Sequence, residues 1–437
     1  MNGMLEFRTQ GYNGYAVKYS PFFDSRIAVA ASANYGLVGN GRLYILGLTA
    51  NGIQAEKWYD TQDSLYDTAW SEAHENQIAV ACGDGSVKLF DVSVPEFPVM
   101  SWQEHNREVY AVSWNLVTKD TFASSSWDGT IKVWSPNRPA SILTLPTHSC
   151  TYSTAFSPHS PSVLSSVTSD SHLRIFDLRT PASASNHLVH LIPIHGAGST
   201  GGISSVGGNR QNFPPAEVLT HDWNKYRDTV IATGGVDTIA RTFDIRNPRG
   251  GPTTLLEGHQ YAIRKLAWSP HLSDVLLTAS YDMSCRVWTD GSTTAHPGIM
   301  GGAKQLGQMN RHTEFATGVD WCLFGAEGWC ASTAWDERLL VWDEHDRVSI
   351  TRDDLAWTKR KRLVSKFLSE IQGNGRYGRH DRMPWYDCIE THNGEEKRRP
   401  LPKVAERNPT TDGSQGDPFW VYTTLRAVAL KQPGYQK

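Results

Sequence analysis

The chain has 437 residues, of which 39% are hydrophobic and 20% charged, enough to bury a sizeable core. The net charge of −3 gives no sign of nucleic-acid or anionic-membrane binding, and the sequence has neither the apolar core of a signal peptide nor an apolar run long enough to span a bilayer. Because the six cysteines form no C-x-x-C pair, we expect free thiols, no metal site and a soluble intracellular protein.

The chain begins with LEFRT (residues 5–9), which belongs to no repeat. Residues 14–48 then form a loose first copy of a pattern that becomes regular further on. In this copy Tyr19 stands where later copies have an upstream aromatic residue, and Asn40 stands where they have an aspartate. About seven extra residues separate the two positions.

Six regular copies follow the first one. In each, an aspartate stands six residues before a closing aromatic residue, and an upstream Trp or Phe stands 14 or 15 residues before the aspartate. The pairs are Asp84/Phe90, Asp128/Trp134, Asp170/Phe176, Asp237/Phe243, Asp282/Trp288 and Asp336/Trp342, and the upstream residues are Trp70, Trp114, Phe156, Trp223, Trp268 and Trp321.

Each copy predicts four short strands, because apolar runs end at the upstream aromatic residue, before the Asp turn and at the closing aromatic residue, and a fourth run follows. A single sheet of this kind cannot bury both faces, so the copies are expected to stack radially. The pattern resembles the WD40 repeat. The predicted fold is therefore all-β, a seven-bladed WD40 β-propeller over residues 1–345, in which LEFRT supplies the outer strand of the last blade and closes the ring.

Histidines recur upstream of the repeats. We expect the aspartate of each turn to accept a hydrogen bond from the histidine of its copy, which makes both residues structural rather than catalytic. The second and fifth copies are expected to lack the histidine, since Thr61 and Pro214 stand at its position. The recurring histidines are His105, His148, His259 and His312.

Two regions depart from the repeat. The Gly/Ser-rich residues 195–215 widen the spacing between the fourth and fifth copies and predict a mobile inter-blade loop. After residue 345 the pattern stops, so residues 346–437 are expected to be a largely disordered C-terminal extension, with 354–371 as a short amphipathic helix. Residues 359–362 match a nuclear localisation patch, but a solvated basic helix end is the simpler interpretation.

No catalytic motif was found. The sequence has no G-x-S-x-G elbow, Walker A loop or H-E-x-x-H helix, and "GNGRLY" (39–44) has Tyr44 where a dinucleotide loop needs its third glycine. We therefore expect a protein that is not an enzyme and that uses no cofactor.

A propeller without catalytic chemistry is expected to bind at one end of its ring. Repeat register predicts the residues at that end: four and six positions before the upstream aromatic residue, and one before the turn aspartate. The first set is Tyr15, Tyr66, Tyr110, Tyr152, Leu219, Arg264 and Thr317; the second is Asn13, Ser64, Glu108, Cys150, Glu217, Ala262 and Phe315; the third is Gly39, Gly83, Trp127, Ser169, Val236, Tyr281 and Trp335.

Ten candidate binding residues combine apolar and aromatic side chains, which are expected to be exposed, with carboxylates. This combination favours an amphipathic helix that carries an apolar stripe beside positive charge. The carboxylates are Glu108, Glu217 and, one step outward, Asp63, and the other candidates are Tyr66, Tyr110, Trp127, Tyr152, Leu219, Tyr281 and Trp335.

Several segments resemble the peroxin-7 family, the WD40 receptors for the type 2 peroxisomal targeting signal. Among them are "GYAVKYSPFFDSRIAVAASANYGLVGNGRLYIL", "EVLTHDWNKY" and "HTEFATGVDW", and the likeness covers about residues 5–343. The resemblance implies a cytoplasmic receptor that binds the helical N-terminal signal of matrix proteins together with a co-receptor peroxin. It also implies delivery to a docking complex at the peroxisomal membrane, cycling between cytoplasm and peroxisome, and no insertion into the bilayer.

The resemblance gives the carboxylates a role, namely contact with the basic residue of the signal by Glu108 and Glu217 and, less directly, by Asp63. Two other readings stay open. One is a general WD40 interaction scaffold, such as a ubiquitin-ligase substrate adaptor or a histone-binding protein. The other is an enzyme with a propeller fold.

Overall fold

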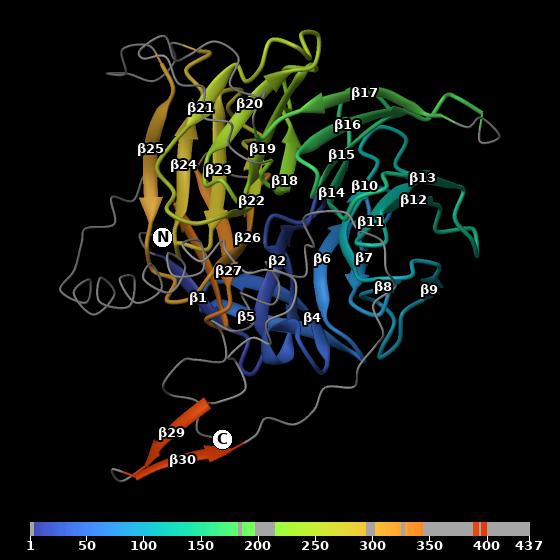
Figure 1. The fold of residues 1–437 in the computed structure, drawn as a ribbon. Helices are drawn as coiled ribbons and strands as arrows, with labels where there is room; N and C mark the ends of the chain where they lie inside the picture. The colour runs from blue at the N-terminus through green and yellow to red at the C-terminus, as the bar shows by residue number, and fades with distance from the viewer. Residues whose placement is uncertain are drawn as a thin grey trace. The chain divides into compact units, whose positions relative to one another are not determined.

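The computed structural model describes residues 4–181, 186–196, 215–293, 302–324 and 328–343, together with the backbone of 388–392 and 395–399. The chain divides into two compact units, residues 1–349 and 350–437. In the first unit the described residues form seven four-stranded antiparallel sheets, which confirms the predicted seven-bladed propeller (Figure 1). The sheets are called blades 1 to 7 in chain order.

The first strand of each blade lies innermost. These strands contact one another in a closed ring, each touching its equivalents in the two neighbouring blades. They are β2 (Asn13–Tyr19), β6 (Leu65–Trp70), β10 (Val109–Trp114), β14 (Thr151–Phe156), β18 (Val218–Trp223), β22 (Ile263–Trp268) and β26 (Ala316–Trp321).

The remaining strands follow outward in chain order. The second strands are β3 (Arg26–Ser32), β7 (Gln77–Cys82), β11 (Phe122–Ser126), β15 (Val163–Thr168), β19 (Val230–Gly235), β23 (Val275–Ser280) and β27 (Trp329–Ala334). The third are β4 (Gly41–Thr49), β8 (Ser86–Asp91), β12 (Thr130–Trp134), β16 (His172–Asp177), β20 (Ala240–Asp244), β24 (Cys285–Thr289) and β28 (Arg338–Asp343). The outer strands of blades 1 to 6 are β5 (Gly52–Thr61), β9 (Met100–Gln103), β13 (Leu143–Pro146), β17 (Leu188–Pro193), β21 (Thr254–Leu256) and β25 (Lys304–Met309).

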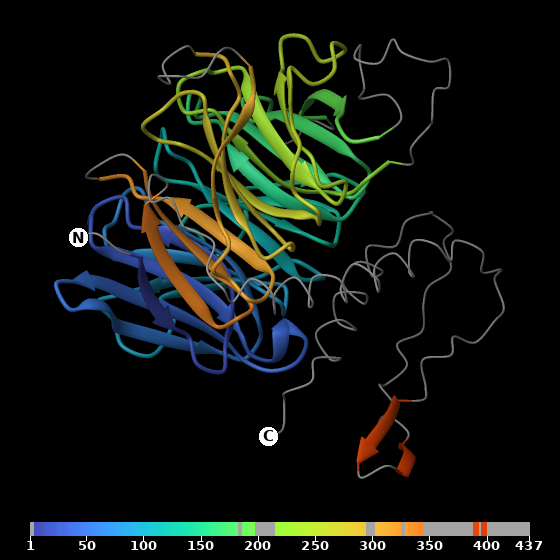
Figure 2. The same cartoon turned by 90° about the vertical axis from the view of Figure 1, so that its left-hand side faces the viewer.

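The outer strand of blade 7 comes from the N-terminus. Strand β1 (Leu5–Arg8) runs antiparallel to β28, with Leu5 opposite Val341 and Arg8 opposite Arg338. In Figure 2 the blue first blade lies beside the orange last blade, where this pairing joins the two ends of the ring. The predicted closure by residues 5–9 is confirmed.

The core consists of interfaces between neighbouring blades rather than one central cluster. Each of the seven inter-blade spaces holds its own group of buried apolar side chains. Between blades 2 and 3, for example, the ring centroid of Trp102 lies 5.7 Å from that of Trp134 and 5.4 Å from that of Phe122. The repeated aromatic residues are therefore the contacts that hold the blades together.

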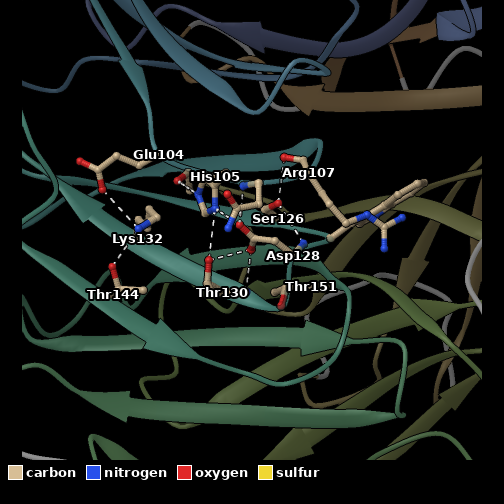
Figure 3. A network of polar contacts seen from close by, with 12 residues as sticks. Glu104, His105, Arg107, Ser126, Asp128, Thr130, Lys132, Thr144 and Thr151 are labelled. Atoms are coloured by element: carbon tan, nitrogen blue, oxygen red, sulfur yellow. Dashed lines mark hydrogen bonds and ion pairs between the residues drawn. The ribbon is translucent and has the colours of Figure 1, made fainter. Parts of the chain in front are cut away.

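The turn aspartate of blade 3 is held by a buried hydrogen-bonded network (Figure 3). The Nδ1 atom of His105 lies 2.9 Å from Asp128 Oδ2, and its Nε2 atom lies 2.8 Å from the hydroxyl of Ser124. The indole N–H of Trp134 donates to the same hydroxyl at 2.8 Å. Equivalent networks occur in blade 6 (His259, Asp282, Thr278, Trp288) and blade 7 (His312, Asp336, Ser332, Trp342).

Two predictions about the histidines were wrong. Blade 5 does have one: His195 lies 2.8 Å from Asp237, although the insertion separates it in sequence from β18. In blade 4, His148 is exposed, and Asp170 instead pairs with Arg174 at 2.6 Å. Of the Gly/Ser-rich segment, residues 197–214 lie outside the described residues.

The second unit contributes a two-stranded antiparallel sheet, β29 (Cys388–His392) with β30 (Glu395–Arg399). The amphipathic helix expected at 354–371 and the basic patch at 359–362 lie outside the described residues. Across the described ranges, no helix has the length and apolar character needed to cross a bilayer.

Candidate functional site

Every innermost strand carries a β-bulge near its start. In all seven blades the register shift falls at the residue four positions before the upstream aromatic residue. A bulge re-aims the side chain of its extra residue, and the ring contacts described below place these side chains together at one end of the axis, here called the channel mouth. The bulged residues are Tyr15, Tyr66, Tyr110, Tyr152, Leu219, Arg264 and Thr317.

A recurring backbone hydrogen bond joins the other two predicted sets at the same end. In blades 2 to 7 the residue before the turn aspartate donates its N–H to the carbonyl of the residue six positions before the upstream aromatic residue. In blade 3, for example, Trp127 donates to Glu108 at 3.1 Å, and in blade 7 Trp335 donates to Phe315 at 3.0 Å. The turn and the entry loop of each blade therefore form one rim around the mouth.

The aromatic side chains at the mouth form a belt that is interrupted at blade 5. Along blades 1 to 4, ring centroids are 5.2 Å apart for Tyr15 and Tyr66, 5.1 Å for Tyr66 and Tyr110, and 5.7 Å for Tyr110 and Tyr152. Trp127 stacks on Tyr110 at 5.1 Å. The five rings thus form one connected series of contacts, and four of them belong to the candidate binding residues.

The belt continues through blades 6, 7 and 1. Phe315 lies 5.0 Å from Tyr281 and 5.3 Å from Trp335, and Trp335 lies 5.8 Å from Tyr15. Leu219 occupies the corresponding place in blade 5 and is buried. The ring of seven blades thereby brings together residues that are spread over more than 300 positions of the chain.

The expectation that these aromatic residues are exposed is wrong. Tyr66 is 3% exposed and Trp335 is 7% exposed, and the other candidates of the belt fall between these values. The physical reason is geometric: seven bulged side chains converge on one narrow axis, so each is covered by its neighbours. Only the edges of the belt face outward, and the more accessible groups are those on the rim.

The three predicted carboxylates lie on the rim, each on the entry loop of a different blade. Glu108, from blade 3, has a side chain that is 34% exposed and lies 3.7 Å from Arg107. Asp63, from blade 2, accepts the N–H of Ser64 at 2.6 Å, and burial raises its pKa. The carboxylates are therefore spread around the mouth, and the described residues contain no group of three acidic, histidine or cysteine side chains that could hold a metal ion.

Glu217, from blade 5, is tied to the belt. The hydroxyl of Tyr152 donates to Glu217 Oε2 at 2.9 Å. Burial and the neighbouring carboxylate together raise the pKa of Tyr152 well above its usual value. The hydrogen bond from Tyr152 thus holds the carboxylate of Glu217 against the belt.

Sequence reasoning missed the loop between β3 and β4. Its short 3₁₀ turn η1 (Ala33–Gly36) has two non-glycine residues, Asn34 and Tyr35, in the left-handed region, at φ of 48° and 58°. The hydroxyl of Tyr15 donates to the carbonyl of Tyr35 at 2.7 Å, and that of Tyr66 donates to the carbonyl of Gly36 at 3.1 Å. The only sequence signal for this loop was the extra length of the first copy.

The seven four-stranded sheets and their repeated turns define a class of protein, the WD-repeat β-propeller. The WD40 family model (WD domain, G-beta repeat) matches residues 96–135, 140–177 and 250–289. The chain is 39% identical to the peroxisomal targeting signal 2 receptor of Saccharomyces cerevisiae, over 78% of this chain and 99% of that protein.

Further relatives agree. The chain is 41% identical to the peroxisomal targeting signal 2 receptor of Komagataella phaffii, over 78% of this chain and 99% of that protein. It is 40% identical to peroxisome biogenesis protein 7 of Arabidopsis thaliana, over 76% of this chain and 96% of that protein. The chain belongs to the family of peroxisomal targeting signal 2 receptors.

Proposed function

We propose that this protein is a receptor for the type 2 peroxisomal targeting signal and acts in the import of peroxisomal matrix proteins. The observation that carries this proposal is its similarity to receptors of that name over almost their whole length. It favours the receptor over the alternatives of a general WD40 scaffold, a ubiquitin-ligase adaptor or a histone-binding protein. A targeting receptor also needs no catalytic site, in line with the expectation that the chain is not an enzyme.

The proposed binding site is the rim of the channel mouth. A signal helix would lay its apolar stripe along the outward edges of the belt, at Tyr66, Tyr110 and Trp127. Its basic residue would lie near Glu108 or Glu217, since a carboxylate at a half-buried site attracts a cation more strongly than one in open water. Tyr152, Leu219, Tyr281 and Trp335 would complete the contact, and Asp63 would add a more distant charge.

The proposed function also includes further partners and movement between the cytoplasm and the peroxisome. A co-receptor peroxin would cover the helix on the rim, and a docking complex at the peroxisomal membrane would receive the loaded receptor. The protein would cycle between the cytoplasm and the peroxisome without inserting into the bilayer. Residues 1–345 would perform this role, with residues 346–437 as an extension outside the propeller.

The test is fluorescence anisotropy of a labelled type 2 signal peptide, with and without a co-receptor peroxin. Glu108→Gln combined with Glu217→Gln should weaken binding by about tenfold, because each lost charge pair is worth up to about 1 kcal/mol. The matched control is Glu75→Gln combined with Glu96→Gln, two exposed carboxylates in loops at the other ends of the strands. Absence of binding to the unmodified protein under every condition would contradict the proposal.

A further inference from the structure

The channel mouth contains one residue that the proposed function does not use. Among the seven bulged residues, six are neutral and Arg264 carries a full charge. It is 4% exposed. A guanidinium remains protonated in proteins, so this position holds a permanent positive charge beneath the face on which the signal would lie.

Arg264 reaches across the axis. Its guanidinium carbon lies 4.5 Å from the ring centroid of Tyr110. Arg264 belongs to blade 6 and Tyr110 to blade 3, three blades away in a ring of seven. The side chain therefore crosses the channel and lies at the centre of the mouth, stacked on an aromatic ring by a cation–π contact.

The neighbouring charges along the axis are already paired. Lys265, the next residue, lies 3.1 Å from Asp67 of blade 2. Lys18 lies 2.9 Å from Asp320, and Lys225 lies 2.8 Å from Asp222. These three lysines and three carboxylates form pairs, so none of these carboxylates is left over for Arg264.

Within the described ranges, Arg264 has no carboxylate at ion-pair distance, and its buried Nε atom has no hydrogen-bond acceptor. Buried polar groups in folded proteins are almost always satisfied, and an exception calls for an explanation. The π face of Tyr110 offsets part of the desolvation of the guanidinium but supplies no oxygen acceptor. The guanidinium of Arg264 is thus not paired with a described carboxylate, although the more distant charge of Asp67 helps to keep it protonated.

We propose that Arg264 is a specificity-determining residue of the receptor face: its fixed charge confines cationic side chains of the ligand to the rim and favours carboxylate or carbonyl groups over the channel mouth. This inference rests on the proposed function. The rim carboxylates Glu108 and Glu217 attract a basic residue outward, while Arg264 repels it from the centre. The attraction by these carboxylates and the repulsion by Arg264 together orient an amphipathic helix that carries its basic residue near one end.

The expected size of the effect follows from Coulomb's law. For a ligand charge about 8 Å from Arg264, at an effective dielectric constant of about 20, the energies of attraction and of repulsion differ by enough to change affinity by well over tenfold. Screening by salt reduces this difference to about tenfold in affinity. A peptide with glutamate over the mouth should therefore bind about ten times more tightly than the same peptide with lysine there.

The experiment is a charge scan of the labelled type 2 signal peptide. Each position outside the signal's defining residues is replaced singly by Lys and by Glu, and affinities are measured by anisotropy with the co-receptor present. The receptors are the unmodified protein, Arg264→Met, Arg264→Lys and Arg26→Met. Arg26 is the matched control, since its guanidinium also lies over an aromatic ring, 4.4 Å from Phe23, but it begins β3 and so lies at the other end of the strands.

At one or more positions the unmodified protein and the Arg264→Lys and Arg26→Met variants should prefer Glu over Lys by about tenfold, and Arg264→Met should reduce this preference to less than threefold. Circular dichroism and thermal unfolding check that each variant is folded.

An unchanged preference in folded Arg264→Met would overturn the inference while leaving the receptor function intact. If Arg264→Met does not fold, the scan of the unmodified protein decides, because the absence of any position that prefers Glu contradicts the inference. Failure of the unmodified protein to bind any signal peptide would instead overturn the proposed function, and the inference with it.

Discussion

The network beneath the turn of blade 3 and the channel mouth both bury charged side chains, but they differ in how those side chains are satisfied. His105, Asp128, Ser124 and Trp134 hydrogen-bond to one another in a chain. The guanidinium of Arg264 lies over the ring of Tyr110, and its Nε atom has no hydrogen-bond acceptor among the described residues. A satisfied network holds the blade in one geometry, whereas an unsatisfied charge leaves interaction energy available to a ligand.

The pKa values agree with this difference. Burial alone would raise the pKa of Asp128, but hydrogen bonds from His105 and Thr130 outweigh burial and hold it well below its usual range. The pKa of Asp63 on the rim is raised by burial, because the hydrogen bond from Ser64 only partly opposes it. The comparison teaches that the polar residues of the blade 3 network satisfy one another, whereas those of the mouth are satisfied less completely.

The largest expected effect is on stability in the blade 3 network. His105→Ala should lower the free energy of unfolding by about 4 kcal/mol, because it removes a buried side chain and leaves Asp128 and Ser124 short of a partner. Urea unfolding followed by tryptophan fluorescence measures the change. The matched control is His148→Ala, the exposed histidine near the equivalent position of blade 4, which should change stability by no more than about 0.5 kcal/mol. Equal losses of stability in the two variants would show that the hydrogen-bonded network of His105 adds nothing to the stability of the blade.

Adjacent residues on β22 sharpen the comparison at the axis. Lys265→Met should lower the free energy of unfolding by about 3 kcal/mol, since it leaves the buried carboxylate of Asp67 without its cation. Arg264→Met should change it by about 1 kcal/mol or less, because none of the described carboxylates lies at ion-pair distance from Arg264. Chemical denaturation of both variants tests the prediction, and adding Asp67→Asn to Lys265→Met should recover part of the loss. A larger loss for Arg264→Met than for Lys265→Met would reverse the argument.

Acid should weaken the inter-blade core through His221. This histidine on β18 is buried and its Nε2 atom lies 2.7 Å from the hydroxyl of Ser165, and burial lowers its pKa to about 4. Because the unfolded chain takes up a proton near pH 6.5 and the folded chain does not until about pH 4, stability is full above pH 6.5 and falls as the pH decreases toward 4. The loss should reach about 2 kcal/mol at pH 5.

Urea unfolding between pH 7 and pH 4.5 measures this dependence. The control variant is His221→Gln, which keeps a polar side chain but cannot titrate. Its stability should change less over the same range. Parallel pH profiles for the two proteins would exclude His221 as the source.

The smallest expected effect is on the rim. Tyr152→Phe removes the hydroxyl that donates to Glu217 and leaves the ring of the belt in place. Affinity for the signal peptide should change by about fivefold or less, since one hydrogen bond to a half-exposed carboxylate is worth about 1 kcal/mol or less, and stability should change little. Anisotropy and thermal unfolding measured side by side test this. A loss of stability as large as that of His105→Ala would place Tyr152 with the framework instead.

Much of the fold was predictable because the repeat is local. The spacing between Asp128 and Trp134, and its recurrence in the other copies, predicts the strands, their number and the closing role of residues 5–9. The same register predicts which residues lie at the mouth, since every blade repeats the same bulge. His195 was not predicted because an insertion separates it from β18, so it does not stand at the usual distance before the upstream aromatic residue Trp223.

Burial at the mouth was not predictable from one blade. Register places Tyr66 and Tyr110 at the end of their strands but does not reveal that their neighbours cover them. Nor does it reveal contacts between blades far apart in sequence, such as Arg264 with Tyr110 or Lys265 with Asp67. These depend on the diameter of the ring, which is set by the packing of all seven sheets.

The sequence by itself determined the repeat, the strand order and the identity of the residues at the rim, because hydrogen bonding within a blade and the alternation of its side chains are short-range effects. Only the tertiary structure decided which of those residues are buried, which charges are neutralised and which are not. Charge pairing and burial depend on distances across the axis, and those distances exist only once the ring has closed through β1 and β28.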